Sequence, residues 1–248
     1  MPKKYMTDFT ILIHTLTSLQ PFAIALSFLL LYIFEYFLPQ RKELADWRHD
    51  IQNILLGLLN FGIAFGAGYY FQVLLTLVNT HQWGLFSLLS VNGLLLGSIQ
   101  LICIDLFMYW WHRFNHVLPG LWYFHRFHHA DTKMNTTTAF RFHAGELILS
   151  YFLKLIVFGL LGMAVWVVIL YNLLFVPVVI FHHSNISISV RRDNFLRHIL
   201  VTPRMHRIHH SCIKAETDSN YGSLFPWWDI IFKSARKKPL EENIKFGL

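Results

Sequence analysis

The sequence predicts an all-α, polytopic membrane protein with about four transmembrane helices. Three observations lead to this prediction. Only 14% of the 248 residues are charged and 54% are hydrophobic, whereas a soluble domain carries about 25% charged residues. Apolar runs long enough to cross a membrane recur along the chain. Histidines recur in three clusters at helical spacing, and these clusters follow the apolar runs.

Four apolar segments reach the roughly 20 residues that a spanning helix needs. The second segment contains glycines that could tilt or break it, and the third ends in tryptophans of the kind that lie at the membrane interface. The last is too long for one crossing, and Gly159 and Gly162 would allow a helical hairpin, either two spans or a re-entrant pair. Four crossings are the simplest count for a single domain over 1–248. The spans are expected near 19–38, 51–78, 88–111 and 147–181.

Basic residues orient these spans, because cytoplasmic loops carry an excess of lysine and arginine. The loop 79–87 contains neither residue, whereas the tail 182–248 contains eleven. We therefore expect the loop 39–50 and the histidine-rich segments 112–146 and 182–235 to lie in the cytoplasm. The net charge of +7 fits basic residues beside anionic headgroups. No nucleic-acid-binding motif is present, so we expect no nucleic-acid partner.

Three histidine clusters, "HRFNH", "HRFHH" and "HRIHH", repeat spacings of three and four residues. Residues three and four apart share a helix face, so we expect each cluster to aim two or three imidazoles at one point. Neutral imidazole is a ligand for iron, zinc, copper and nickel, whereas neighbouring imidazolium ions would repel one another. The clusters therefore predict metal binding. Their members are His112 and His116, then His125, His128 and His129, then His206, His209 and His210.

Eight clustered histidines exceed the four ligands of a structural zinc site. They suit two metal ions, each with several nitrogen ligands and an open coordination position. His143 in "RFHAGE" and His183 in "FHHSN" could complete a site. His182 would point differently from its neighbour His183, so we expect only one of that pair to bind metal.

The ordered motifs resemble the fatty acid hydroxylase/sterol desaturase superfamily over about residues 20–235. "DLFMYWWHRFNH" (105–116) is similar to its D-x3-Y-x2-H-R-x2-H stretch, and "NTTTAFRFHAGE" (135–146) to its T-x-R-x-H-x-x-E stretch. "FHHSN" resembles its F-x-H-x-N motif, which favours His183 over His182. The segment 202–232 resembles its closing signature, with N-Y-G and W-D. Two departures, "HAGE" without the usual proline and "FKSAR" in place of F-G-T, look peripheral to the metal.

The resemblance implies a helical bundle capped by a cytosolic helical domain that carries a dinuclear metal site. The cofactor would be two iron ions, and the reaction an O2-dependent hydroxylation of a lipid C–H bond. A desaturase with the same site is the alternative, because small differences in substrate placement decide the product. A dinuclear zinc hydrolase is less favoured. A transporter is disfavoured because its ligands would lie at the bilayer midplane.

The substrate could be a fatty acyl, sterol or ether lipid, and the closing signature favours an alkylglycerol- or sterol-type relative over a ceramide hydroxylase. Electrons would come from a separate protein, because no haem-attachment motif, dinucleotide-binding glycine pattern or cysteine set for an iron–sulfur cluster is present. We expect a ferredoxin, rubredoxin or cytochrome b5 with its reductase. The basic cytoplasmic face would attract an acidic partner.

Acidic residues near the clusters are candidate acceptors for the histidine N–H groups that do not face metal. Asp105 lies seven residues before His112, at the end of a span, where an ionisable residue is costly and usually paired. We expect Asp105 to bond a ligand histidine from another segment. Glu146 and Asp229 are weaker candidates of the same kind.

Overall fold

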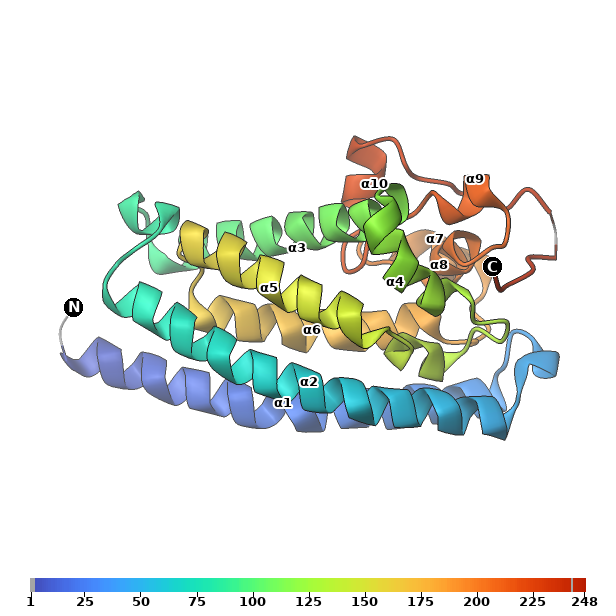
Figure 1. Ribbon diagram of the computed structural model, residues 1–248, viewed down its shortest axis with the longest axis horizontal. Helices are drawn as coiled ribbons and strands as arrows, with labels where there is room; N and C mark the ends of the chain where they lie inside the picture. Colours follow the sequence, from blue (N-terminus) through green and yellow to red (C-terminus); the bar gives the residue numbers. More distant parts are fainter. Residues whose placement is uncertain (1–2, 242) are drawn as a thin grey trace.

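The protein is a bundle of long helices with a cap of short helices at one end (Figure 1). This computed structural model describes residues 3–241 and 243–248, with side chains for 15–43, 45–241 and 243–248. The described part of the chain contains no strand. Five of its helices are long and apolar enough to cross a membrane. They are α1 (Lys3–Phe37, apolar from Thr15), α2 (Trp47–Thr80), α3 (Gly93–Val117), α5 (Ala144–Leu161) and α6 (Val165–His183).

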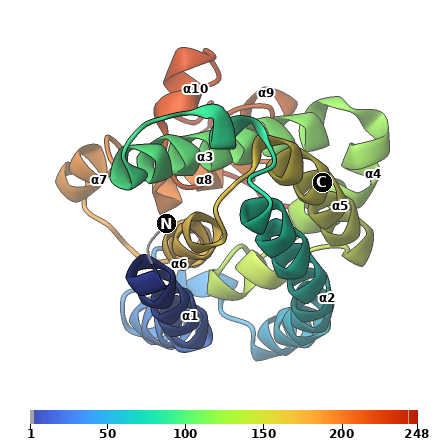
Figure 2. The same cartoon turned by 90° about the vertical axis from the view of Figure 1, so that its left-hand side faces the viewer.

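The expected count of four spans becomes five candidates because the last apolar segment folds as two helices. α5 and α6 have 18 and 19 residues, which makes each about 27 Å long, close to the roughly 30 Å of a hydrocarbon core. The left-handed Gly162 ends α5, so the chain reverses and α6 returns beside its neighbours (Figure 2). The third span also runs further than expected, to Val117, so His112 and His116 lie on its last turns.

The turn between α5 and α6 packs tightly against the segment that follows α2. Gly162 has a φ of +72°, and a Cβ at this position would lie 2.5 Å from the Trp83 carbonyl oxygen. Gly162→Ala should therefore lower the melting temperature, because the left-handed backbone costs about 1–2 kcal/mol with a side chain and the clash adds to it. In the control Gly66→Ala, the new Cβ would meet nothing within 4 Å. Equal melting temperatures for the two variants would contradict this account.

The short helices gather at the end of the bundle where α3 and α6 finish (Figure 1). Two of them begin with proline at the first helical turn, Pro119 and Pro203, where the missing N–H is not needed. The Thr202 side chain also accepts the Met205 N–H at the start of α8. These signals fix where the two histidine-bearing cap helices begin. The cap consists of α4 (Pro119–His129), η3 (Thr136–Phe140), α7 (Val190–Leu196), α8 (Pro203–His209), α9 (Lys214–Thr217) and α10 (Trp227–Ile231).

A buried polar network ties the loop after α4 to the first two helices. Glu35 of α1 accepts hydrogen bonds from the Thr136 N–H (2.8 Å), the Thr136 hydroxyl (2.5 Å) and the Asn185 N–H (2.7 Å). Asp131 lies 2.7 Å from His49 Nε2 of α2 and accepts the Thr138 hydroxyl. Because these groups are buried, each needs its partner, and the loop is held in one position beside the cap.

Candidate metal centre

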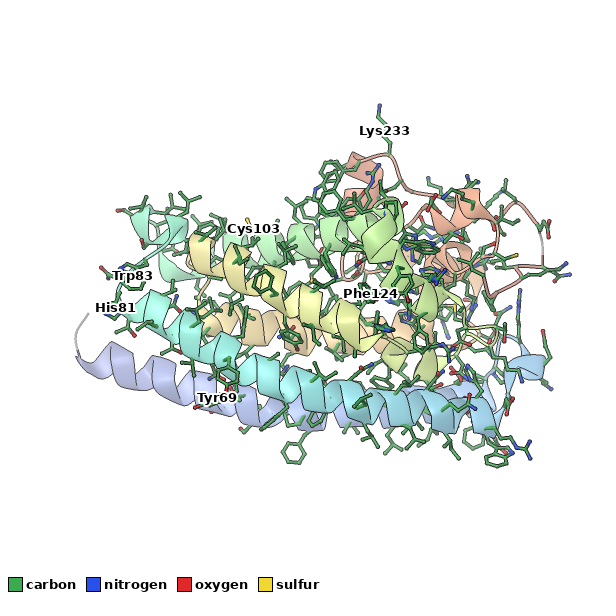
Figure 3. The ribbon with its side chains drawn as sticks, in the orientation of Figure 1. Tyr69, His81, Trp83, Cys103, Phe124 and Lys233 are labelled. Carbon is green, nitrogen blue, oxygen red and sulfur yellow. The ribbon has the colours of Figure 1, made fainter. Side chains whose placement is uncertain are left out.

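Nine histidines from α3, α4, α6 and α8 converge where the bundle meets the cap. They form two groups, and within each group one nitrogen per residue lies within 4.8 Å of the others. All nine are buried except His112, which is partly buried. By contrast, His81 lies at the opposite end of the molecule, stacked on Trp83 (Figure 3). Group A comprises His112, His116, His125, His129 and His209, and group B comprises His128, His183, His206 and His210.

The two groups divide the H-x2-H-H clusters, so each such cluster aims two imidazoles at one group and the third at the other. On α4, His125 and His129 face group A whereas His128 faces group B. At α8 the assignment is reversed: His209 faces group A, and His206 and the following His210 face group B. Successive residues are about 100° apart around a helix, so adjacent histidines reach different centres. The helices α4 and α8 therefore lie between the groups and serve both.

The groups are adjacent. The ring centroids of His129 (group A) and His210 (group B) are 4.4 Å apart, and those of His206 and His209 are 5.0 Å apart. Two ions held by these groups would be neighbours. The arrangement fits a dinuclear centre.

Backbone carbonyls orient four of the rings. The Nδ1 atoms of His112 and His209 lie 2.8 Å and 2.7 Å from the carbonyl oxygens of Tyr221 and Ser219. In group B the acceptors are the carbonyls of Arg141 for His128 (3.1 Å) and Val179 for His183 (2.7 Å). A carbonyl oxygen only accepts, so Nδ1 carries the hydrogen in all four rings. Each Nε2 is then left with a lone pair facing its group.

In group B the two lone pairs that the carbonyls fix, on Nε2 of His128 and of His183, face one another at short range, and the Nε2 atoms of His206 and His210 lie beside them. His183 Nε2 lies 3.0 Å from His128 Nε2 and 3.0 Å from His206 Nε2, and His210 Nε2 lies 3.2 Å from that of His206. Two lone pairs at 3.0 Å repel unless a cation lies between them. The imidazole donor set suits iron and the neighbouring transition metals.

Group A leaves buried nitrogens without partners. His125 Nε2, His209 Nε2 and both ring nitrogens of His116 and His129 have no hydrogen-bond partner among the described residues. An unsatisfied buried polar group costs about 1–3 kcal/mol, so this many in one place indicates a ligand. The residues present fit a second metal ion.

A proton is a poor substitute for that metal. Burial lowers the pKa of His128, His129, His206 and His210 well below the ordinary histidine value, and the neighbouring histidines lower it further. Burial lowers the pKa of His209 to about 3. These rings are therefore neutral near physiological pH, which is the protonation state that binds metal.

Glu146 is the acidic residue that contacts a clustered histidine. Its Oε1 lies 3.0 Å from His125 Nδ1, and both side chains are buried. A carboxylate in this position fixes the ring orientation and makes the imidazole a stronger ligand.

Glu146→Gln should lower metal affinity about 10- to 100-fold, because the acceptor loses its charge. The measurement is the metal content per chain during titration with a chelator. Glu43→Gln, at an exposed position in η1 (Lys42–Leu44), is the control and should match the wild type. Equal retention of metal by both variants would exclude this role for Glu146.

Asp105 does not contact a clustered histidine, so the expected bond to a ligand histidine is wrong. Its carboxylate accepts hydrogen bonds from the Tyr171 hydroxyl (2.7 Å), Trp228 Nε1 (2.8 Å) and the Phe225 N–H (3.3 Å). Seven residues correspond to about 10 Å along a helix, which places Asp105 too far below His112 to reach the groups. It ties α3 to α6 and to the segment before α10.

Asp229 acts on the loop that orients His112. It accepts hydrogen bonds from the backbone N–H groups of Tyr221 and Gly222, both at 2.8 Å, and from the Ser234 hydroxyl at 2.7 Å. The Tyr221 carbonyl in turn accepts the His112 Nδ1 hydrogen. Asp229 therefore supports a ligand through one backbone segment and makes no hydrogen bond to a histidine within the described structure.

The two remaining candidate histidines lie outside both groups. His143 is exposed, accepts the Gly145 N–H at the start of α5 and packs against Phe124, with ring centroids 5.0 Å apart. His182 is buried, and its ring centroid lies 4.0 Å from that of His206. The preference for His183 over His182 thus agrees with the placement of His183 in group B.

Several supporting groups carry no signal in a sequence pattern. The carbonyls of Arg141, Val179, Ser219 and Tyr221 act through the backbone, which every residue has. Asp218 is a further acid near the site, 3.6 Å from His116 Nδ1, and it lies in a loop without periodicity. Only the fold brings these groups to the histidines.

A cavity of about 330 Å³ opens beside the two groups. Its floor includes histidines of both groups, and its walls come from α1, α2, α3, α5, α6 and the η3 segment. Most of the wall is apolar, which suits a hydrocarbon chain. Apolar wall residues are Phe61, Ala64, Met108, Trp111, Phe140, Phe142, Leu147, Phe175, Val176, Val179 and Ile180.

Comparison with known proteins agrees with this geometry. Residues 98–234, just over half of the chain, match the family model described as fatty acid hydroxylase. The chain is 28% identical to the ornithine lipid hydroxylase OlsE of Rhizobium tropici over 150 residues, 60% of this chain and 44% of that protein. It is 31% identical to the alkylglycerol monooxygenase of Danio rerio over 146 residues, 58% of this chain and 31% of that protein. The match thus spans less than half of each relative. No solved structure matches.

Proposed function

Because the chain belongs to the fatty acid hydroxylase family, we propose that it is a non-haem di-iron monooxygenase that hydroxylates a C–H bond of a membrane lipid. The observation that carries the proposal is the pair of adjacent histidine groups, with Nε2 lone pairs that face one another at 3.0 Å in group B. The relatives named as an ornithine lipid hydroxylase and an alkylglycerol monooxygenase support a lipid as the substrate.

The histidine groups would hold the two iron ions, with five nitrogens available in group A and four in group B. Bound there, iron would supply the reaction with O2. The chain itself fixes the ligand tautomers through the carbonyl and Glu146 contacts described above. With five or four protein nitrogens, each ion would keep at least one of six coordination positions free for O2.

The cavity would receive the lipid. It is bounded by helices that are candidate membrane spans, so an acyl, sterol or ether lipid could enter from the bilayer without crossing water. The apolar wall would keep bulk water away from the reacting carbon. The chain thus provides both the metal ligands and the apolar binding site that this reaction needs.

Electrons would come from a separate protein such as a ferredoxin, a rubredoxin or cytochrome b5 with its reductase. The basic residues beside the cap favour a cytoplasmic location for it under the positive-inside rule. A docked acidic donor would then approach the same end of the bundle that holds the histidines.

The test is the mass of the lipid product. Iron-loaded protein in nanodiscs is incubated with a lipid extract, a ferredoxin with its reductase, and O2 labelled with oxygen-18. We expect a lipid that has gained one labelled oxygen atom, and no product under nitrogen. A lipid that has lost two hydrogens without gaining oxygen would indicate the desaturase instead. Lipid hydrolysis that persists without O2 in zinc-loaded protein would overturn the oxygenase proposal.

A further inference from the structure

One basic side chain lines the cavity within a candidate membrane span. Lys154 lies on α5, ten residues after the helix begins at Ala144. It is the only lysine or arginine among the described residues that line the cavity. An ionisable residue at membrane depth is costly unless a partner compensates its charge, and such residues usually mark functional sites.

The Lys154 ammonium group makes no ion pair with a described residue, and the charge of Glu146 acts on it only from a longer distance. No carboxylate oxygen among the described residues lies within 4 Å of its Nζ, and its recorded contact is with the Tyr151 ring, 5.6 Å away. Side chains on a helix lean toward its N-terminus, and Tyr151 is three residues earlier. The ammonium group therefore lies back toward the histidine end of the cavity.

Other polar groups with free hydrogen-bonding capacity line the same cavity. Ser150 and Glu146 lie one and two turns from Lys154 on the α5 wall. Glu146 Oε2, Asn60 Oδ1 and both amide atoms of Asn115 are buried without a hydrogen-bond partner among the described residues. A few unsatisfied polar groups in an otherwise apolar cavity are typical of a site that recognises the polar part of a ligand.

We propose that Lys154 binds an anionic oxygen, a carboxylate or a phosphate, of the lipid that occupies the cavity. The proposal rests on the proposed function and adds the substrate class to it. The anion would supply a counter-charge in direct contact with the ammonium group, where the described residues offer only the more distant charge of Glu146, and the hydroxyl of Ser150 would offer a further hydrogen bond.

This contact would also set which carbon is oxidised. Lys154 lies eight residues from Glu146, about 12 Å along the helix axis, and its side chain leans back toward the histidines. An anion held there keeps the polar end of the lipid close to the metal groups. The oxidised carbon would then lie near the polar end of the lipid and not at the far end of an acyl chain.

The experiment measures binding by the metal-loaded full chain in nanodiscs, without O2 or electron donor. The probes are palmitate, palmitoyl lysophosphatidate and the neutral hexadecanol. We expect at least one anion to bind about 10-fold more tightly than hexadecanol, and Lys154→Met to remove this preference. Lys154→Arg keeps the charge and should retain it. Lys233→Met is the control, because Lys233 is exposed and points away from the bundle (Figure 3).

The comparison between the anions identifies the source of the charge. Tighter binding of palmitate indicates a carboxylate, and tighter binding of the lysophosphatidate indicates a phosphate. Hexadecanol binding as tightly as both anions in the wild type would overturn the proposal, even if Lys154→Met failed to fold. So would an unchanged preference in Lys154→Met with wild-type metal content.

The binding experiment and the oxidation experiment can fail separately. Anion binding that depends on Lys154, in a protein that oxidises no lipid, would refute the proposed function and leave this site in place. Lipid oxidation by a protein that shows no preference for anions would support the proposed function and refute the anion site at Lys154.

Discussion

His206→Ala is expected to lose at least half of the bound metal and to lower lipid oxidation more than about 100-fold. His206 Nε2 lies 3.0 Å from His183 Nε2 and 3.2 Å from His210 Nε2, so it is central to group B. Removing a residue that only orients a ligand costs about 10- to 100-fold, and removal of the ligand itself should cost more. Elemental analysis of the purified variant and the product yield measure the two effects.

The matched control is His143→Asn. His143 lies outside both groups and caps α5 by accepting the Gly145 N–H, and asparagine is a good residue at a helix N-cap. This variant should keep wild-type metal content and activity. If His206→Ala instead retained all of its metal while His143→Asn lost metal, the assignment of the groups would be wrong.

Asp105→Ala is expected to destabilise the protein by several kcal/mol. The substitution leaves the Tyr171 hydroxyl, Trp228 Nε1 and Phe225 N–H without their acceptor, and each unsatisfied buried group costs about 1–3 kcal/mol. A loss of this size is a large fraction of a typical unfolding free energy of about 5–15 kcal/mol. Thermal unfolding in detergent measures it.

Metal content separates this structural role from a role in metal binding. The folded fraction of Asp105→Ala should hold as much metal per chain as the wild type, because Asp105 makes no contact with a clustered histidine. A variant with an unchanged melting temperature and reduced metal content would contradict the structure and restore Asp105 as a partner of a ligand.

The spans and the histidines were predictable because both follow from local rules. Apolar length indicates a membrane helix, and the regular spacing of histidines on α3, α4 and α8 indicates candidate metal ligands. The number of spans was harder to predict, because it depends on one left-handed turn at Gly162, where a Cβ would clash with the Trp83 carbonyl.

The assignment of histidines to two groups could not be read from the sequence. It depends on how α4 and α8 are rotated against each other, and packing sets that rotation. The same limit applies to Asp105. Its spacing from His112 shows that the two residues share a helix face, but it does not show that α6 and the α10 segment contact Asp105 at its level of the helix. Lys154 carries no sequence signal, because a single lysine in an apolar run has no pattern around it.

The most direct test of the central claim is the metal content of the detergent-purified protein. Cells are grown with iron-57, and elemental analysis is combined with Mössbauer spectroscopy. The proposed function predicts two magnetically coupled irons per chain, one for each histidine group. Two zincs per chain from cells grown with ample iron, together with lipid-directed activity that does not depend on iron, would contradict the di-iron account.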